Sequence, residues 1–336
     1  MTGSVLGIDL GGTKIAIAGK RGREVGESRV EGTDLDSAES LIEQIVGLVG
    51  EERDEDLAGV GIGVPSIIEF DSGRVVSSVN IPLADVPLRE TLGERVGVPV
   101  FLDNDATVAA LAESHDDELR QAVRDLVMLT IGTGVGGGLV LGGRIYRGAS
   151  GAAGELGHTI VGMDLASTVP RPMKFPQPGS LEFVASGHAL DRLAQQAAKL
   201  HGDSELARLA SEDKPVLGAD AVEAARGGDL AAARIVEIWG QRVGIGVANA
   251  INTFDPEEVV IGGGAAQAGE MLLEPARRVA GDYVVAGLGK NTNIRLARHG
   301  IRAGVIGAAL LAEHELEDET QASAGDSGRA SAEASR

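Results

Sequence analysis

Two glycine turns, each set between apolar runs, carry the groups in this chain that are best able to bind a phosphorylated ligand. The first lies in Val5–Ile15, VLGIDLGGTKI, and the second in Leu129–Leu141, LTIGTGVGGGLVL. Each stretch predicts a strand, a tight turn and a second strand. Because glycine lets the backbone approach a ligand closely, N–H groups at such a turn can bind phosphate oxygens. The pair indicates a nucleotide phosphate site, although either turn alone also fits an ordinary hairpin.

Two carboxylates stand where they could assist phosphoryl transfer, a reaction that needs charge neutralisation and a proton acceptor. Asp9 ends the first predicted strand, and its carboxylate could hold Mg²⁺ through water, since Mg²⁺ takes few protein carboxylates. Asp105 follows the predicted strand Val98–Leu102 and opens a helix, where α/β folds place ligands. Asp105 is therefore a candidate general base. The alternatives are structural: a turn cap for Asp9 and a helix N-cap for Asp105.

The composition is that of a soluble globular chain with room for two lobes and two cores. Aromatic residues make up only 2% of the 336 residues, so the cores must consist of Ala, Val, Ile and Leu. No apolar run approaches the ~20 residues of a membrane span, and the N-terminus has no basic leader, which predicts a cytoplasmic protein without a membrane partner. The absence of cysteine excludes disulfides, thiolate metal sites and a cysteine nucleophile.

The net charge of −20 argues against a nucleic-acid partner, because phosphate backbones require a basic surface. Only six of the thirty basic residues are Lys. An acidic, Lys-poor surface suits a salt-rich cytoplasm, in which screening weakens self-repulsion. A G+C-rich genome would also replace Lys with Arg, so both explanations stay open.

The predicted elements follow the order hairpin, helix, strand, helix, and the plan restarts at Asp125. This order indicates an α/β fold of mixed sheets flanked by helices. We expect an N-terminal lobe over 1–116, a C-terminal lobe over 117–300, a closing helix over 301–315 that packs on the first lobe, and a disordered acidic tail over 316–336. The expected helices are 37–50, 106–112, 181–200, 230–253, one from 270 and 303–311; the expected strands include 60–65, 98–102, 125–130 and 256–264, and 66–87 is expected to be a loop.

Five motifs in order resemble the ROK family of bacterial and archaeal sugar kinases, within the actin-like ATPase superfamily. They are GIDLGGTK at 7–14, NDA at 104–106, GTGVGGG at 132–138, GELGH at 154–158 and DPEEVVIGGG at 255–264, and they cover roughly residues 5–312. The resemblance implies two duplicated actin-like, ribonuclease H-like lobes with a cleft between them. It also implies ATP and Mg²⁺ as cofactors and phosphorylation of a hexose, with glucose at its 6-hydroxyl as the first expectation.

The resemblance assigns site residues position by position. The ATP phosphates would contact the first two turns, and the third glycine turn would line the adenine and ribose. Its spacing lacks the dinucleotide fingerprint that is the alternative reading. Expected nucleotide and metal contacts are Asp9, Gly11, Gly12, Thr13, Lys14, Gly132, Thr133, Gly134, Gly262, Gly263 and Gly264; expected sugar contacts are Asn80, Asn104, Asp105, Glu155, His158 and Glu182, the last of which also reads as an ordinary first-turn helix glutamate.

The chain departs from the family pattern at the zinc site. The resembling proteins hold a structural zinc with the histidine of the ExGH motif and three cysteines, but this chain has no cysteine. A proline-rich segment, 170–178, stands in place of the cysteine motif. His158 without such partners is a poor zinc ligand, so we predict no structural zinc and a loop stiffened by its prolines.

Other functions stay open at this point. The acceptor could be another hexose or an N-acetylated amino sugar, namely mannose, fructose, N-acetylmannosamine or N-acetylglucosamine, and the phosphoryl donor preference is undecided. Regulators of the same family carry a helix-turn-helix before the first motif, whereas only four residues precede Val5 here, so a regulator or a non-catalytic sugar sensor is the weaker expectation. Relatives are often dimers or tetramers, which predicts a homo-oligomer.

Overall fold

The computed structural model describes residues 3–78, 80–162, 174–212 and 214–333, with side chains described as far as residue 322. The chain divides into two compact units. Unit 1 comprises Met1–Ala122, Gly143–Ala153 and Ile301–Arg336, and unit 2 comprises Val123–Gly142 and Gly154–Gly300. The segment Gly143–Ala153 thus belongs with the N-terminal part of the chain, which the sequence did not predict.

Unit 1 is built on a mixed sheet whose parallel strands end at one edge. The strand order is β3-β2-β1-β5-β8, with β4 also paired to β2; β1 and β2 are antiparallel, whereas β1, β5 and β8 are parallel. Asp9 on β1 lies in register with Gly63 on β5, which in turn lies in register with Asp103 on β8. The acidic residues therefore gather at the carboxyl edge. The strands are β1 (Ser4–Leu10), β2 (Lys14–Arg21), β3 (Glu24–Val25), β4 (Arg29–Gly32), β5 (Leu57–Val64) and β8 (Val100–Asn104).

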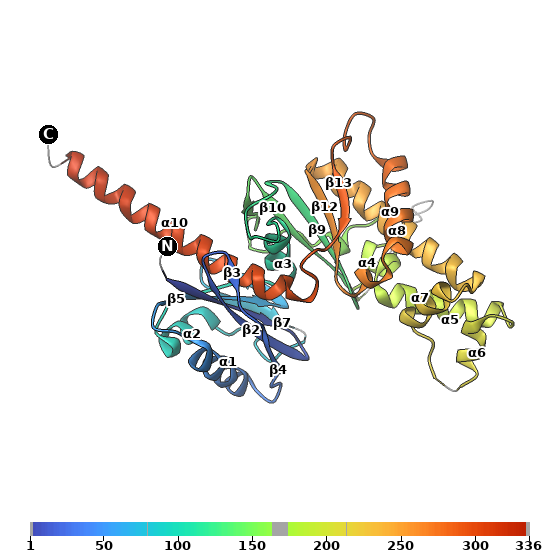
Figure 1. The fold of residues 1–336 in the computed structure, drawn as a ribbon, viewed down its shortest axis with the longest axis horizontal. Coiled ribbons are helices and arrows are strands. Elements are labelled where there is room, and N and C mark those ends of the chain that lie inside the picture. Colours follow the sequence, from blue (N-terminus) through green and yellow to red (C-terminus); the bar gives the residue numbers. More distant parts are fainter. Residues whose placement is uncertain (1–2, 79, 163–173, 213, 334–336) are drawn as a thin grey trace. The chain divides into compact units, whose positions relative to one another are not determined.

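Helices cover both faces of this sheet. Helices α1 (Ala38–Glu52) and α2 (Leu88–Val96) contribute to a buried aliphatic core with the strands, while α3 (Asp105–Glu113) and α10 (Ala303–Glu333) pack together against β1, β5 and β8 (Figure 1). Glycines on the strands permit this contact. A Cβ on Gly61 would lie 1.8 Å from a carbonyl oxygen of α10, so only glycine lets the helix approach so closely.

The last helix is much longer than the sequence predicts. The structure continues α10 to Glu333, whereas we expected a helix over 303–311 and a disordered tail from 316. Ion pairs account for the part with described side chains: Lys20 pairs with Glu313, Arg147 with Glu315 and Arg144 with Asp318. A composition rich in Glu and Ser indicated disorder because it lacks apolar residues, but these acidic side chains find cationic partners on unit 1.

A short hairpin lies in the stretch that we expected to be a loop. Strands β6 (Ser66–Glu69) and β7 (Arg74–Ser78) pair antiparallel, and Ile68 and Val75 are buried between them and the core. A turn at Asp71–Gly73 joins the two strands, and Gly73 has a φ of 67° there. The two flanking strands were not predicted, because each has at most five residues and so shows little periodicity. The same unit also holds β11 (Arg144–Ile145).

Unit 2 contains a second mixed sheet with helices against it. Strands run in the order β10-β9-β12-β13, with β9 and β10 antiparallel and β12 parallel to both β9 and β13. Helices α8 and α9 lie side by side along the unit (Figure 1). The elements are β9 (Leu126–Ile131), β10 (Val135–Leu141), β12 (Glu258–Gly262), β13 (Asn293–Leu296), η1 (Leu156–His158), α4 (Leu181–Ala185), α5 (Gly187–Leu200), α6 (Glu205–Ala210), α7 (Gly218–Arg226), α8 (Leu230–Phe254), η2 (Gly264–Ala268) and α9 (Glu270–Tyr283), followed by η3 (Gly300–Arg302).

The predicted helix over 181–200 is wrong in one respect, because it is two helices. Ser186 ends α4 and caps α5, with an extended backbone and a side-chain oxygen that accepts the Ala189 N–H. Gly187 then packs against the backbone of Gly132, where a Cβ would lie 2.7 Å from the carbonyl oxygen. Mixed sheets flanked by helices in both units confirm the predicted α/β class. Within the described ranges, no helix has both the length and the apolar character to cross a membrane.

Candidate active site

The carboxyl edge of the unit 1 sheet holds the candidate metal ligand Asp9 and leads to the candidate general base Asp105. Asp9 is the penultimate residue of β1 and points at the first turn of α10, where a Cβ on Gly304 would lie 2.4 Å from its Oδ2. Burial and, to a smaller extent, the negative charge of Asp105 together raise the pKa of Asp9 to about 6. Asp9 lies in register with Gly63 on β5, and a Cβ on Gly63 would lie 3.5 Å from the Asp105 Cα, so both carboxylates belong to this edge. The structure therefore brings together the candidate metal ligand and the candidate general base.

Asn104, rather than Asp105, caps helix α3. The Asn104 side-chain oxygen accepts the Ala106 N–H at 2.9 Å, and its amide donates to the Ser66 carbonyl at 3.3 Å. Asp105 is the first helical residue, and its Oδ1 accepts the same Ala106 N–H at 2.8 Å. The capping role that competed with catalysis for Asp105 thus belongs to its neighbour.

The first glycine turn, 11–14, is closed by its own backbone. The Gly11 N–H donates to the Lys14 carbonyl at 2.9 Å, and the Thr33 hydroxyl donates to the Gly11 carbonyl at 2.7 Å. Thr13 and Lys14 are exposed at the tip. Asn80 lies beside this turn, since a Cβ on Gly12 would come within 3.2 Å of the Asn80 Cβ. Asn80 and the predicted phosphate turn are therefore neighbours in unit 1.

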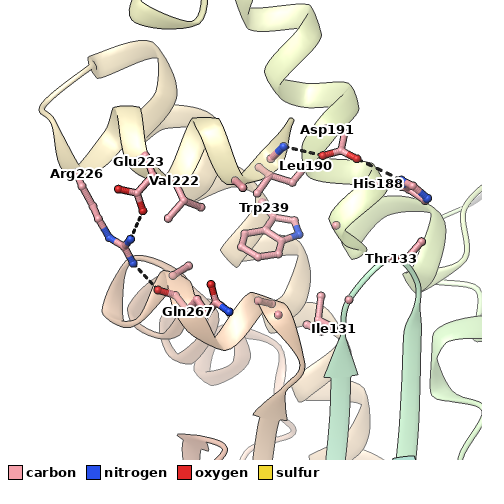
Figure 2. A pocket seen from close by; sticks show the side chains of 17 residues that line it. Ile131, Thr133, His188, Leu190, Asp191, Val222, Glu223, Arg226, Trp239 and Gln267 are labelled. Carbon is pink, nitrogen blue, oxygen red and sulfur yellow. Dashed lines mark hydrogen bonds and ion pairs between the residues drawn. The ribbon is translucent and has the colours of Figure 1, made fainter. Parts of the chain in front are cut away.

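Unit 2 contains a cavity of about 510 Å³ at the end of β9. The tip between β9 and β10, the start of α5, one side of α7, the middle of α8 and the segment η2 all line it (Figure 2). The lining residues are Ile131, Gly132, Thr133, Gly187, His188, Leu190, Asp191, Gly218, Ala219, Val222, Glu223, Arg226, Trp239, Gly264, Ala265, Gln267 and Ala268.

The cavity has an apolar wall centred on Trp239, the only tryptophan of the chain. Figure 2 shows this indole in the middle of the lining, with Ile131, Leu190 and Val222 around it. The indole is 2% exposed, and its N–H donates to the Ala185 carbonyl at 2.7 Å, which fixes the ring. The buried indole therefore anchors a rigid apolar wall of the cavity, and apolar walls are typical of small-molecule sites.

The polar side of the cavity is held by two sets of interactions. His188 Nδ1 lies 3.2 Å from Asp191 Oδ2, and Asp191 Oδ1 accepts the Gly218 N–H at 2.6 Å, which joins α5 to α7. Arg226 on α7 pairs with Glu223 and donates to the backbone carbonyl of Gln267 on η2 (Figure 2). These contacts fix the walls relative to one another, so the cavity is preformed.

Three of the predicted nucleotide contacts line this cavity: Gly132, Thr133 and Gly264. Gly134 instead packs against Glu182, whose Oε2 accepts the Val135 N–H at 2.9 Å. The remaining two glycines of the third turn serve close packing. Gly263 has a φ of 76°, and a Cβ there would lie 2.5 Å from the Ile131 carbonyl oxygen; a Cβ on Gly262 would clash with the Met128 side chain. In the second and third turns, some residues thus line the cavity and others serve close packing.

The predicted sugar contacts of unit 2 lie around η1 and α4. Glu155 precedes η1, and its Oε2 lies 3.6 Å from His158 Nε2. The His158 ring packs edge-on against Phe175, with centroids 4.9 Å apart. Glu182, in the first turn of α4, is tied to the second glycine turn as described above.

The described residues contain no group of three or more His, Asp or Glu that could hold a metal ion. Residues 170–173 of the proline-rich segment lie outside the described ranges. The absence of a structural zinc therefore stays a prediction, based on the lack of cysteine in the sequence.

Most of the cavity lining was not predicted from the sequence. His188, Asp191, Arg226, Trp239 and Gln267 belong to no motif and come together only through the packing of α5, α7, α8 and η2. One signal was available: Ser186 before an amphipathic run is an N-cap pattern that would have placed the start of a helix beside the second turn.

Comparison with known proteins places this geometry in context. The profile described as "ROK family" matches residues 5–315. A glucokinase of Halalkalibacterium halodurans is 33% identical over 92% of this chain and 95% of its own length, and a xylose repressor of Caldicellulosiruptor bescii is 31% identical over 92% of this chain and 78% of its own. The crystal structure of a ROK family glucokinase from Streptomyces griseus, in complex with glucose and AMPPNP, has 31% identity and a TM-score of 0.75, covering 93% of this chain and 100% of that one.

Fold and site therefore define a mixed α/β protein of the actin-like ATPase class, with a preformed cavity beside glycine turns. Within that class, the chain belongs to the ROK family.

Proposed function

We propose that this protein phosphorylates glucose at its 6-hydroxyl, with Asp105 as the general base. The broader activity is that of an ATP-dependent sugar kinase. The observation that carries the proposal is the placement of Asp9 and Asp105 at one sheet edge, with the capping of α3 left to Asn104. The similarity to a glucokinase with glucose and AMPPNP bound supports the choice of acceptor.

Asp105 is suited to receive the hydroxyl proton. It is the first residue of α3, where the positive end of the helix dipole favours a charged carboxylate. As the sugar oxygen attacks the γ-phosphorus of ATP, the bond from that phosphorus to the bridging oxygen breaks and ADP leaves. The carboxylate accepts the hydroxyl proton and then releases it to water. The proposed sugar contacts that accompany it are Asn80, Asn104, Glu155, His158 and Glu182.

The nucleotide is proposed to bind with its base in the unit 2 cavity. A volume of about 510 Å³ is within the range of small-molecule sites, and Ile131, Leu190 and Val222 give the cavity an apolar wall. Gly132 and Thr133 line the same cavity and offer backbone N–H groups and a hydroxyl to phosphate oxygens. The turn 11–14 of unit 1 is proposed as a second phosphate contact.

Asp9 fits the role of a ligand to Mg²⁺. Its carboxylate is largely buried beside Asp105, and a cation would relieve the electrostatic cost that raises its pKa to about 6. One carboxylate suffices, because Mg²⁺ keeps most of its waters. When bound, the ion would supply neutralisation of the ATP phosphate charges.

An ADP-release assay tests the proposal against glucose, mannose, fructose, N-acetylglucosamine and N-acetylmannosamine, in low and high salt. We expect the highest kcat/KM for glucose. Turnover confined to another hexose or to an amino sugar would replace the proposed acceptor. Glucose binding without turnover of any sugar would indicate a sensor or regulator instead.

The role of Asp105 is tested by Asp105→Ala and the isosteric Asp105→Asn. Loss of a general base lowers kcat by roughly 10²–10⁴-fold, while glucose and ATP binding measured by calorimetry stay largely intact. A variant that loses binding but turns over bound substrate at the normal rate would contradict the assigned role.

A further inference from the structure

A partly buried guanidinium, that of Arg147, is paired with the strand that leads to Asp105. Arg147 follows β11 in the segment Gly143–Ala153, which belongs to unit 1. Its Nε donates to Asp103 Oδ2 at 2.7 Å, and a terminal nitrogen donates to Glu315 Oε1 on α10 at 2.7 Å. The guanidinium also lies over the Phe70 ring, 3.5 Å from the centroid. Charge pairing and stacking on a ring use the whole planar group, a combination that only Arg provides.

The carboxylate of Asp103 connects this guanidinium to the candidate catalytic turn. Asp103 lies in β8 with its side chain only 4% exposed, and its Oδ1 accepts the Asn104 backbone N–H at 2.9 Å. Burial raises the pKa of Asp103, and the charge of Arg147 opposes that rise. A charged acceptor makes a stronger hydrogen bond than a neutral one. By keeping Asp103 charged, Arg147 therefore strengthens the hydrogen bond from the Asn104 N–H to Asp103 at the end of the strand.

We propose that Arg147 is a positioning residue for Asp105, acting through Asp103 on the backbone of the turn from β8 to α3. The inference rests on the proposed function, in which Asp105 is the base. Arg147 keeps Asp103 charged, Asp103 holds the Asn104 N–H, and the turn presents Asp105 in one orientation. Arg147 also precedes Glu155, another proposed sugar contact, by only eight positions in the sequence.

A purely structural pair is the alternative. Replacing a buried ion pair by apolar groups is often neutral for stability, so burial of Arg147 and Asp103 is weak evidence of a stabilising role. The chain offers a matched comparison. Arg144, in the same segment, pairs with Asp318 on the same helix α10, but these side chains are 64% and 37% exposed, and within the described residues Arg144 makes no hydrogen bond to Asp103.

The test compares Arg147→Ala, Arg147→Lys and the control Arg144→Ala in the full chain, with kcat and both KM values measured. Misplacement of a reacting group by about 1 Å costs roughly 100-fold, so we expect Arg147→Ala to lower kcat by about that factor with the KM for ATP unchanged. Arg147→Lys recovers part of the loss, since an ammonium can donate to Asp103 but lacks the planar group that stacks on Phe70. Added guanidine partly restores Arg147→Ala, and Arg144→Ala behaves as the unchanged protein does.

Each outcome distinguishes a positioning role of Arg147 from a purely structural ion pair. Equal kcat values for Arg147→Ala and Arg144→Ala would overturn the positioning role, as would a rise in both KM values without a fall in kcat. If Arg147→Ala does not fold, the kcat of Arg147→Lys decides in the same way. An unchanged protein that turns over no sugar would refute the proposed function itself, which is a different result.

Discussion

The raised pKa of Asp9 leads to a prediction about stability as well as activity. Asp9 is ionised at neutral pH in a largely buried site beside Asp105, and its pKa is raised from 3.8 to about 6. A raised pKa means that the folded state favours the protonated form. The stabilisation of the folded state by protonated Asp9 is fully present below about pH 3.8 and is lost as the pH rises through about 6. Above that range, ionised Asp9 destabilises the empty protein.

The size of the effect follows from the shift. A rise from 3.8 to about 6 corresponds to about 3 kcal/mol between the two protonation states. Asp9→Asn removes the charge and keeps the shape. We expect the free energy of unfolding of the variant to exceed that of the unchanged protein by up to about 3 kcal/mol at pH 8, with little difference at pH 4. Activity should be lost in parallel, because the amide is a poor ligand for Mg²⁺.

Urea unfolding at pH 4, 6 and 8, without nucleotide or Mg²⁺, measures the difference. Asp117→Asn, an exposed carboxylate of the same unit, is the control and should change little at any pH. Asp105→Asn should also stabilise at pH 8, since it removes the charge that contributes to the raised pKa of Asp9. A gain for Asp9→Asn that is equal at pH 4 and pH 8, or absent at pH 8, would refute the electrostatic reasoning.

Three further predictions address the unit 2 cavity, its packing and the acidic surface. Binding of ADP should change the emission of Trp239, the only tryptophan, and saturable binding without any spectral change would argue against a base beside the indole. Gly263→Ala should lower the free energy of unfolding by roughly 2 kcal/mol or more, because φ is 76° and a Cβ would lie 2.5 Å from the Ile131 oxygen; urea midpoints check this. With a net charge of −20, the urea midpoint should rise with KCl, and an unchanged midpoint between low and high salt would count against a salt-adapted surface.

Several features of the site could be predicted from the sequence, because they depend on local chemistry. Asp9 and the turn 11–14 follow from an apolar run that breaks into glycines, and Asp105 follows from a strand that ends where a helix begins. Turn residues and strand periodicity depend on a few neighbouring positions, so they can be recognised in the sequence alone. The α/β class followed from the same local patterns.

The tertiary structure alone decided which distant side chains meet. Arg147 and Asp103 are 44 positions apart and Arg147 and Glu315 are 168 apart, so no spacing rule could have joined them. The same holds for Trp239 and Thr133 in the cavity, and for the tail that composition marked as disordered but that forms helix α10. Charges and apolar faces find partners through the packing of whole elements, and that packing depends on the three-dimensional path of the chain.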